Sequence, residues 1–178
     1  MKRTVCVSLA ARAARYEKKG DRMIDVAIPG FGTLELTTLV CDYNGTLARD
    51  GILLDHVRSR LPRIGQMLRI HVVTGDTFGT VREQLRDLSC EIAIMPADGQ
   101  AEAKRELVTR LGAAHAVAIG NGRNDRLLLA AAALGIAVVG DEGAAAEALH
   151  VSDVVVRHIV DAFELLLEPR RLVATLRS

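Results

Sequence analysis

Short apolar segments alternate with amphipathic segments along most of the chain. Six apolar segments have the length of buried strands: residues 38–41, 70–73, 91–95, 116–119, 136–139 and 154–156. Segments with helical spacing of their apolar residues lie between and after them, over 57–68, 80–88, 101–111, 125–134, 144–149 and 159–167. This alternation predicts an α/β fold of three layers, α/β/α and Rossmann-like, with a mainly parallel sheet.

A different pattern precedes the first core strand. Residues 23–28 and 33–36 alternate apolar with polar side chains around Pro29-Gly30-Phe31-Gly32, which predicts an antiparallel hairpin. Residues 1–22 carry seven basic and two acidic side chains. We expect them to form a basic N-terminal extension that is partly disordered, with a single core domain over residues 23–178.

Composition narrows the choice of function. The length of 178 residues fits one domain, and 23 basic against 22 acidic side chains give a net charge of +1. Such a chain has no overall field to attract nucleic acid, and with 3% aromatic residues and no Trp it has little to stack on bases. We therefore expect no nucleic-acid partner. An anion must be bound by local groups.

The cysteines and the uncharged stretches bear on location. Cys6, Cys41 and Cys90 are far apart and odd in number, which is typical neither of a disulfide framework nor of a CxxC metal site. The longest stretch without a charge, residues 127–140, is shorter than the roughly 18 residues that a membrane helix needs. We expect a cytoplasmic protein with no membrane partner.

Three polar loops follow predicted strands. They are Asp42-Tyr43-Asn44-Gly45-Thr46, Thr74-Gly75-Asp76-Thr77 and Gly120-Asn121-Gly122-Arg123-Asn124-Asp125, and Lys104 lies in the first turns of a helix between the last two. Taken singly, each has an ordinary explanation as a turn, a helix cap or a solvated side chain. Because ligands of parallel sheets bind at the carboxyl ends of strands, the joint pattern indicates one site.

The residue types in these loops suit phosphoryl transfer. A carboxylate such as Asp42 can attack phosphorus and form an aspartyl-phosphate, which splits one hard hydrolysis into two steps. Thr74 can donate to a phosphoryl oxygen, and Lys104 can neutralise its charge. Asp125 and the Asn44 carbonyl are oxygen donors of the kind that hold Mg²⁺ beside Asp42. The amides of residues 44–46 can surround phosphate oxygens.

The chain resembles the haloacid dehalogenase (HAD) superfamily of phosphohydrolases, whose four motifs match Asp42-x-x-Gly45-Thr46, Thr74-Gly75-Asp76, Lys104 and the loop over residues 120–125. The likeness is strongest to the phosphorylation domain of P-type ATPases, with motifs DKTGT, TGD and GDGxND, and covers about residues 38–157. It implies an HAD-like hydrolase in which Asp42 is the nucleophile. It further implies roles for the remaining residues, in catalysis (Asn44, Thr74, Lys104), in phosphate binding (Gly45, Thr46, Thr74, Gly75, Lys104) and in magnesium binding (Asp42, Asn44, Asn121, Asp125).

Two positions depart from the family pattern. Phosphatases of the superfamily carry Asp, the general acid and base, where this chain has Asn44. An amide exchanges no proton near neutral pH, and general acid–base help contributes about 10² to 10⁴ in rate, so we expect slow turnover. Asn121 replaces the first metal carboxylate of the ATPase motif, which predicts weaker magnesium affinity.

The spacing of the motifs leaves no room for a cap domain. About 30 residues separate Asp42 from Thr74, and about 30 separate Thr74 from Lys104. Capless relatives often cover the site with a neighbouring subunit or act on macromolecules, so a homo-oligomer, a small phosphorylated substrate and a partner protein all stay open.

Three functions remain. The first is a magnesium-dependent phosphatase or phosphotransferase, acting on a phosphoric monoester or an acyl phosphate. The second is a catalytically weak regulatory or binding module, which Asn44 and Asn121 favour. The third, a receiver domain, also uses Asp, Thr and Lys in this order, but it explains neither Gly45-Thr46 nor the loop over residues 120–125.

Overall fold

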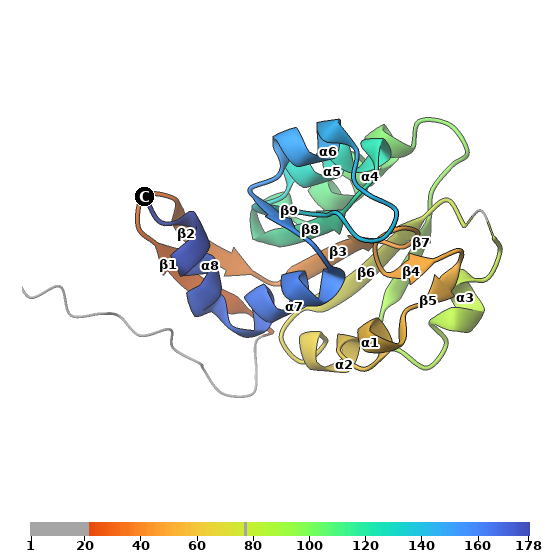
Figure 1. Cartoon of the computed structure of the whole chain (residues 1–178), viewed down its shortest axis with the longest axis horizontal. Coiled ribbons are helices and arrows are strands. Elements are labelled where there is room, and N and C mark those ends of the chain that lie inside the picture. Colours follow the sequence, from red (N-terminus) through yellow and green to blue (C-terminus); the bar gives the residue numbers. More distant parts are fainter. Residues whose placement is uncertain (1–21, 77) are drawn as a thin grey trace, which may run out of the picture.

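The computed structural model describes residues 22–76 and 78–178. The prediction for residues 1–22 lies outside the described residues except at Arg22. The centre of the fold is a sheet of six strands in the order β10-β9-β8-β3-β6-β7, in which every neighbouring pair is parallel (Figure 1). In chain order these strands are β3 (Thr38–Asp42), β6 (Arg69–Thr74), β7 (Glu91–Ile94), β8 (Ala116–Gly120), β9 (Leu134–Val138) and β10 (Val154–Val156). The predicted parallel α/β sheet is confirmed.

Helices cover both faces of this sheet. One face carries α4 (Gln100–Leu111), α5 (Arg126–Ala131) and α6 (Ala146–Val151), and the other carries α1 (Asp55–Arg58), α2 (Leu61–Ile64), α3 (Val81–Gln84) and α7 (Ile159–Leu167). The central strand β3 shows why both faces are covered. Val40 packs in the core under α4 and α5, whereas Leu39 and Cys41 pack in the core of the opposite face. All five residues of β3 are buried, as expected for a strand between two layers.

A hairpin and the last helix form a separate layer at one end of the molecule. Strands β1 (Ile24–Ile28) and β2 (Gly32–Leu36) pair antiparallel, which confirms the predicted hairpin. Their apolar side chains face α8 (Pro169–Leu176), a helix that the sequence did not predict. The backbone N–H of Ser178 donates to the Pro29 carbonyl, so the end of the chain is fastened to the hairpin turn.

The predicted helix over residues 57–68 is wrong, since two short helices, α1 and α2, stand in its place. Pro62 explains the break, because a proline inside a continuous helix loses one hydrogen bond and its ring clashes with the carbonyl four residues earlier. The helix predicted to reach residue 134 ends at Ala131, and Leu134 already begins β9.

The chemistry-bearing loops come together because of the strand order. Strands β8, β3 and β6 are neighbours, so the loops that follow them lie side by side at the carboxyl edge. A two-stranded flap, β4 (Ala48–Arg49) and β5 (Ile52–Leu53), follows the first loop. Between Asp42 and Lys104, the described residues hold this flap, three short helices and strands β6 and β7, with no cap domain.

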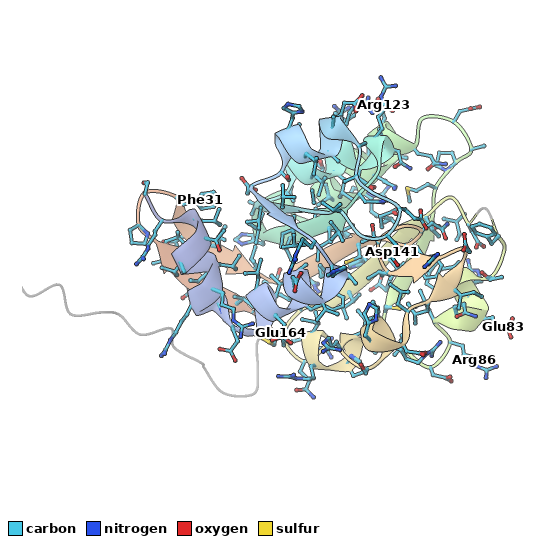
Figure 2. The ribbon with its side chains drawn as sticks, viewed as in Figure 1. Phe31, Glu83, Arg86, Arg123, Asp141 and Glu164 are labelled. Atoms are coloured by element: carbon cyan, nitrogen blue, oxygen red, sulfur yellow. The ribbon has the colours of Figure 1, made fainter. Side chains whose placement is uncertain are left out.

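Charged side chains point outward from the helical layers. Glu83, Arg86, Arg123 and Glu164 all lie at the outer surface, and Phe31 marks the tip of the hairpin, far from Asp141 beside the carboxyl edge (Figure 2). Within the described part of the chain, no helix is both long and apolar enough to cross a membrane.

Candidate active site

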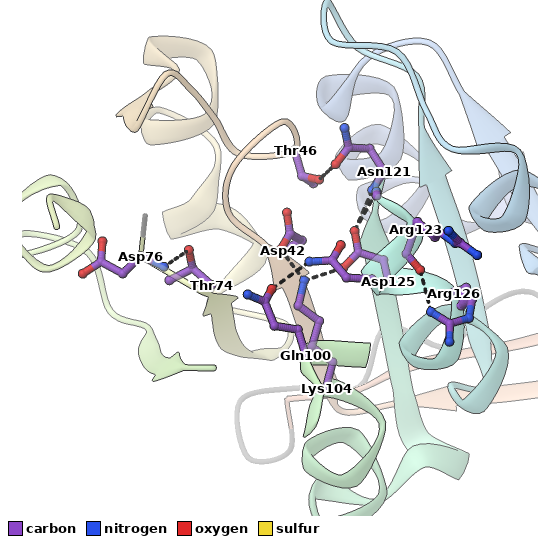
Figure 3. A network of polar contacts seen from close by, with 12 residues as sticks. Asp42, Thr46, Thr74, Asp76, Gln100, Lys104, Asn121, Arg123, Asp125 and Arg126 are labelled. Atoms are coloured by element: carbon purple, nitrogen blue, oxygen red, sulfur yellow. Dashed lines mark hydrogen bonds and ion pairs between the residues drawn. The ribbon is translucent and has the colours of Figure 1, made fainter. Parts of the chain in front are cut away.

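Three buried charged side chains meet at the carboxyl edge of the sheet (Figure 3). The Lys104 ammonium nitrogen lies 2.6 Å from Oδ1 of Asp42 and 2.7 Å from Oδ1 of Asp125. Lys104 and Asp125 are fully buried, and Asp42 is 7% exposed. We call these three residues the buried charge cluster. Two carboxylates around one ammonium give the cluster a surplus negative charge, which favours a cation beside it.

Asp42 is presented by a strand end followed by a tight turn. The pairing of β3 with β6 continues one residue past the strand, because the Tyr43 N–H donates to the Val73 carbonyl. The Tyr43 carbonyl then accepts from the amides of Thr46, Leu47 and Ala48, which turns the chain back sharply. Gly45 has φ +76°, a left-handed conformation that glycine adopts without strain. The turn therefore leaves the Asp42 carboxylate at the edge of the sheet.

Lys104 reaches the carboxylates from α4. Its position on the helix shares a face with Ala101, Leu107 and Val108, all of which are buried. The lysine thus enters the core with the apolar side of the helix, and its long stem is covered by that packing. A buried ammonium costs free energy unless it is paired, and here two carboxylates pair it.

The Asp125 carboxylate is fixed by the turn that precedes it. Its Oδ2 accepts from the N–H groups of Asn121 and Gly122, at 3.0 and 2.8 Å, while Oδ1 accepts from Lys104. Gly120 makes this close approach possible, because a Cβ there would lie 2.5 Å from Cγ of Asp125. The loop therefore needs glycine at residue 120 for steric reasons.

The charge cluster alters proton affinities. Burial and the Asp125 carboxylate raise the pKa of Asp42, the Lys104 ammonium opposes the rise, and the net result is a pKa of about 7 in place of 3.8. Burial lowers the pKa of Lys104, but the two carboxylates outweigh it and the pKa lies above the usual 10.5. Lys104 is therefore charged at neutral pH, whereas Asp42 titrates near neutrality in the metal-free protein.

Thr74 closes the other side of the site. Thr74 is 1% exposed, and its hydroxyl accepts from the Asp76 N–H at 2.9 Å, which leaves the hydroxyl proton free to donate. Asp76 also accepts from the Val81 N–H at the start of α3, which holds the loop after β6 in place. Gly75 has no side chain, and the Gln100 amide nitrogen fills the space, 2.9 Å from where a Cβ would be.

The turn that contains Asn44 offers fewer amides than the sequence suggested. The Gly45 N–H donates to Ala48 and the Thr46 N–H to Tyr43, so both are already used within the turn. Among the described residues, the Asn44 side-chain oxygen is the one buried side-chain nitrogen or oxygen atom without a hydrogen-bond partner. Buried acceptors of this kind are normally satisfied by water or a ligand.

Asn121 links the first loop to the fourth. Its side-chain oxygen accepts from the Thr46 hydroxyl at 3.3 Å, and its amide donates to the Gly143 carbonyl at 3.1 Å. The aspartate of the ATPase motif, which Asn121 replaces, would carry a negative charge at this position. The structure therefore brings Asn121 beside Thr46, at the rim of the site.

The donors at this edge fit a divalent cation such as Mg²⁺, which prefers oxygen ligands. Asp42 and Asp125 provide carboxylates, and Asn44 and Asn121 provide neutral oxygens. Within residues 22–76 and 78–178, no three His, Cys, Asp or Glu side chains form a metal-binding group. A cation held here would take neutral oxygens and water besides the two carboxylates, which favours modest affinity.

One contact at the site was not predicted from the sequence. The side-chain oxygen of Gln100, on α4, accepts from the amide of Asn124, in the loop over residues 120–125, at 2.9 Å. Gln100 stands four residues before Lys104, so helical spacing was the signal that could have placed it on the same face. Arg123 turns away from Asp42 and pairs with Glu147 at 3.0 Å.

Comparison with known proteins gives relatives of two kinds. No protein-family model matches the sequence. Over 62 residues the chain is 57% identical to an uncharacterized protein of Methanocaldococcus jannaschii. The matched segment covers 35% of this chain and 67% of that protein. The chain belongs to the same family as that archaeal protein.

Solved structures identify the fold. A 3-deoxy-D-manno-octulosonate 8-phosphate phosphatase from Moraxella catarrhalis, in complex with magnesium, phosphate and KDO, matches with TM-score 0.63 and 19% identity over 78% of this chain and 90% of that chain. A cobalt-bound phosphatase of the same kind from Haemophilus influenzae matches with TM-score 0.63 and 15% identity, over 80% and 94%. A Legionella pneumophila protein assigned to the HAD superfamily, subfamily III A, matches with TM-score 0.60 and 17% identity, over 79% and 87%.

The fold is that of the HAD superfamily. The resemblance inferred from the motifs is thereby confirmed at the level of the fold. In an HAD fold, the buried charge cluster lies where the sequence placed the motifs, at the carboxyl ends of β3 and β8 with Lys104 between them.

Proposed function

We propose that this chain is a divalent-metal-dependent phosphohydrolase or phosphotransferase that works through an aspartyl-phosphate on Asp42. The observation that carries the proposal is the Lys104 ammonium held between Asp42 and Asp125 at the carboxyl edge. Lys104 engages Oδ1 of Asp42, and Oδ2 is the oxygen left to attack. Magnesium is the proposed metal, because it takes oxygen ligands such as these carboxylates and amides.

In the first step, an Asp42 oxygen forms a bond to phosphorus while the bond to the leaving oxygen breaks and that oxygen keeps the electron pair. Lys104 and the Thr74 hydroxyl stabilise the charge on the oxygens of the transferring group. In the second step, water attacks the same phosphorus, one of its protons passes to a phosphoryl oxygen, and the bond from phosphorus to Asp42 breaks, so that Asp42 leaves as a carboxylate and inorganic phosphate is released. The cation, held by the oxygens of Asp42, Asn44, Asn121 and Asp125, would offset the negative charge of carboxylate and phosphate.

Asn44 determines which substrates suit this site. Its amide gives no proton to the leaving oxygen and takes none from water, so both steps lose general acid–base help. Leaving groups that need no proton, such as those of acyl phosphates or nucleoside triphosphates, are favoured over alkyl alcohols. P-type ATPases carry Thr at the corresponding place, and by that likeness the phosphoenzyme of this chain would be long-lived.

The substrate class follows from the compact core. Residues 23–178 would act as one capless domain in the cytoplasm, on a small phosphorylated molecule or a phosphorylated partner protein. A second subunit would cover the open edge in a homo-oligomer. The alternative is a catalytically weak HAD-like binding module, which the two amides at residues 44 and 121 favour.

One experiment separates the two functions. Purified protein is incubated with Mg²⁺ and either acetyl phosphate or an aryl phosphate, and phosphate release is measured together with an acid-stable, hydroxylamine-labile phosphoenzyme. Asp42→Asn is the control. Release that depends on Asp42 supports the enzyme, and a trapped adduct with little release supports slow phosphotransfer. The absence of both would refute the enzyme and leave the binding module.

A further inference from the structure

Gln100 stands at the first turn of α4, at the inner side of the site. It lies four residues before Lys104, and residues at this spacing share one face of a helix. Lys104 reaches the two carboxylates from that face. The Gln100 side chain therefore extends over the same edge of the sheet, next to the lysine (Figure 3).

The amide of Gln100 is hydrogen-bonded through its oxygen, and its nitrogen lies against the loop after β6. Its oxygen accepts from the Asn124 amide at 2.9 Å. Its nitrogen lies against Gly75, 2.9 Å from the place of a Cβ there, directly beside Thr74. Since the oxygen is engaged by Asn124, the nitrogen is the end that faces the loop after β6. Two loops and one helix thus fix the orientation of a single neutral donor.

We infer that Gln100 is a phosphate ligand of this site and that Asn124 is the residue that positions it. The Gln100 amide nitrogen donates a hydrogen bond to a phosphoryl oxygen, on the side where Thr74 also donates. A neutral donor adds a contact to the phosphoryl group without adding charge to the buried cluster. This inference rests on the proposed function, because it requires that phosphate bind at Asp42, Thr74 and Lys104.

Gln100→Glu is the decisive variant. Glutamate has the same shape and keeps an oxygen to accept from Asn124, so the packing against Gly75 is retained while the donor is replaced by a negative charge. Gln66→Glu is the matched control, because Gln66 is exposed near the surface after α2 and makes no contact with the site. Asn124→Ala removes the group that orients Gln100 but leaves the donor itself.

The measurement is the Kd for inorganic phosphate in the presence of Mg²⁺, by isothermal titration calorimetry, with circular dichroism melts to establish folding. A hydrogen bond to a charged group predicts that Gln100→Ala weakens binding about 10- to 100-fold. We expect a larger loss for Gln100→Glu, a smaller one for Asn124→Ala, and no change for Gln66→Glu. In a variant that already carries Gln100→Ala, adding Asn124→Ala should weaken phosphate binding little further, because the side chain that Asn124 orients is no longer there.

The outcomes distinguish this inference from the proposed function. If wild-type protein binds phosphate and Gln100→Glu, still folded, binds it equally well, Gln100 is a packing residue and the inference is wrong. If Asn124→Ala and Gln100→Ala are fully additive, Asn124 does not act through Gln100. If the wild type binds no phosphate, or Asp42→Asn leaves phosphate release unchanged, the proposed function fails and the role of Gln100 fails with it.

Discussion

Asp42, the proposed nucleophile, is predicted to destabilise the metal-free protein at alkaline pH. The pKa of Asp42 is raised from 3.8 to about 7 by burial and by Asp125. A raised carboxyl pKa contributes stability that is full below pH 4 and is lost as the pH rises through 7. Asp42→Asn removes this titration and leaves Lys104 paired with Asp125 in a cluster without surplus charge.

The size of the effect follows from the two pKa values. The rise in the pKa of Asp42 is worth about 4 kcal/mol at pH 8, where Asp42 is ionised in the folded state. At pH 5 the folded state holds the proton and the cost falls to about 2 kcal/mol. Asp42→Asn should therefore raise the free energy of unfolding at pH 8, with a gain about 2 kcal/mol larger than at pH 5.

The assay is urea unfolding in EDTA at both pH values. Far-UV circular dichroism is the suitable signal, because the chain has no Trp and only two Tyr. Asp25→Asn, an exposed carboxylate on β1, is the matched control and should change little at either pH. A variant at residue 42 that is less stable than wild type at pH 8, or equally stabilised at pH 5 and pH 8, would refute the reasoning.

Four further substitutions test the site. Lys104→Met leaves two buried carboxylates unpaired and should cost about 3–5 kcal/mol in urea unfolding at pH 7.5, and a loss under 1 kcal/mol would contradict the pairing. Gly120→Ala puts a methyl group against Asp125 and should cost about 1–3 kcal/mol in the same assay, with wild-type stability as the opposing result. Asn44→Asp should raise turnover of an alkyl phosphate by about 10²-fold or more, and unchanged turnover with the fold intact would show that residue 44 does not face the leaving group. Asn121→Asp should tighten Mg²⁺ binding in calorimetry, and an unchanged Kd would exclude residue 121 from the metal site.

The sequence predicted the parts of this protein in which one local pattern dominates. Buried strands such as β3 read as short apolar runs, and the polar residues at their ends marked the edge that carries Asp42 and Asp125. Lys104 was singled out by its place in a predicted helix between the second and third polar loops and by the family resemblance, and not by the periodicity of its helix. The neighbouring order of β8, β3 and β6 is a tertiary property, and the motifs, not the periodicity, pointed to it.

The features that could not be predicted depend on contacts between segments that are distant in the sequence. Glu168-Pro169 directly follows the predicted helix over residues 159–167, where a proline is typical of the end of a helix, yet a proline also fits the first turn of a new one, where its missing N–H is not needed. Helix α8 begins at that proline and buries Leu172. The contact between Gln100 and Asn124 could not be predicted, because the two residues lie on different elements of the fold.

The pairing of the first hairpin with α8 has a consequence for the order of folding. The helix that covers the apolar face of β1 and β2 lies about 140 residues further along the chain. Closing so long a segment of chain costs conformational entropy before the contacts between α8 and the hairpin are gained. We therefore expect the hairpin layer to be completed late in folding, and Leu34 and Leu36 to stay exposed until α8 packs on them.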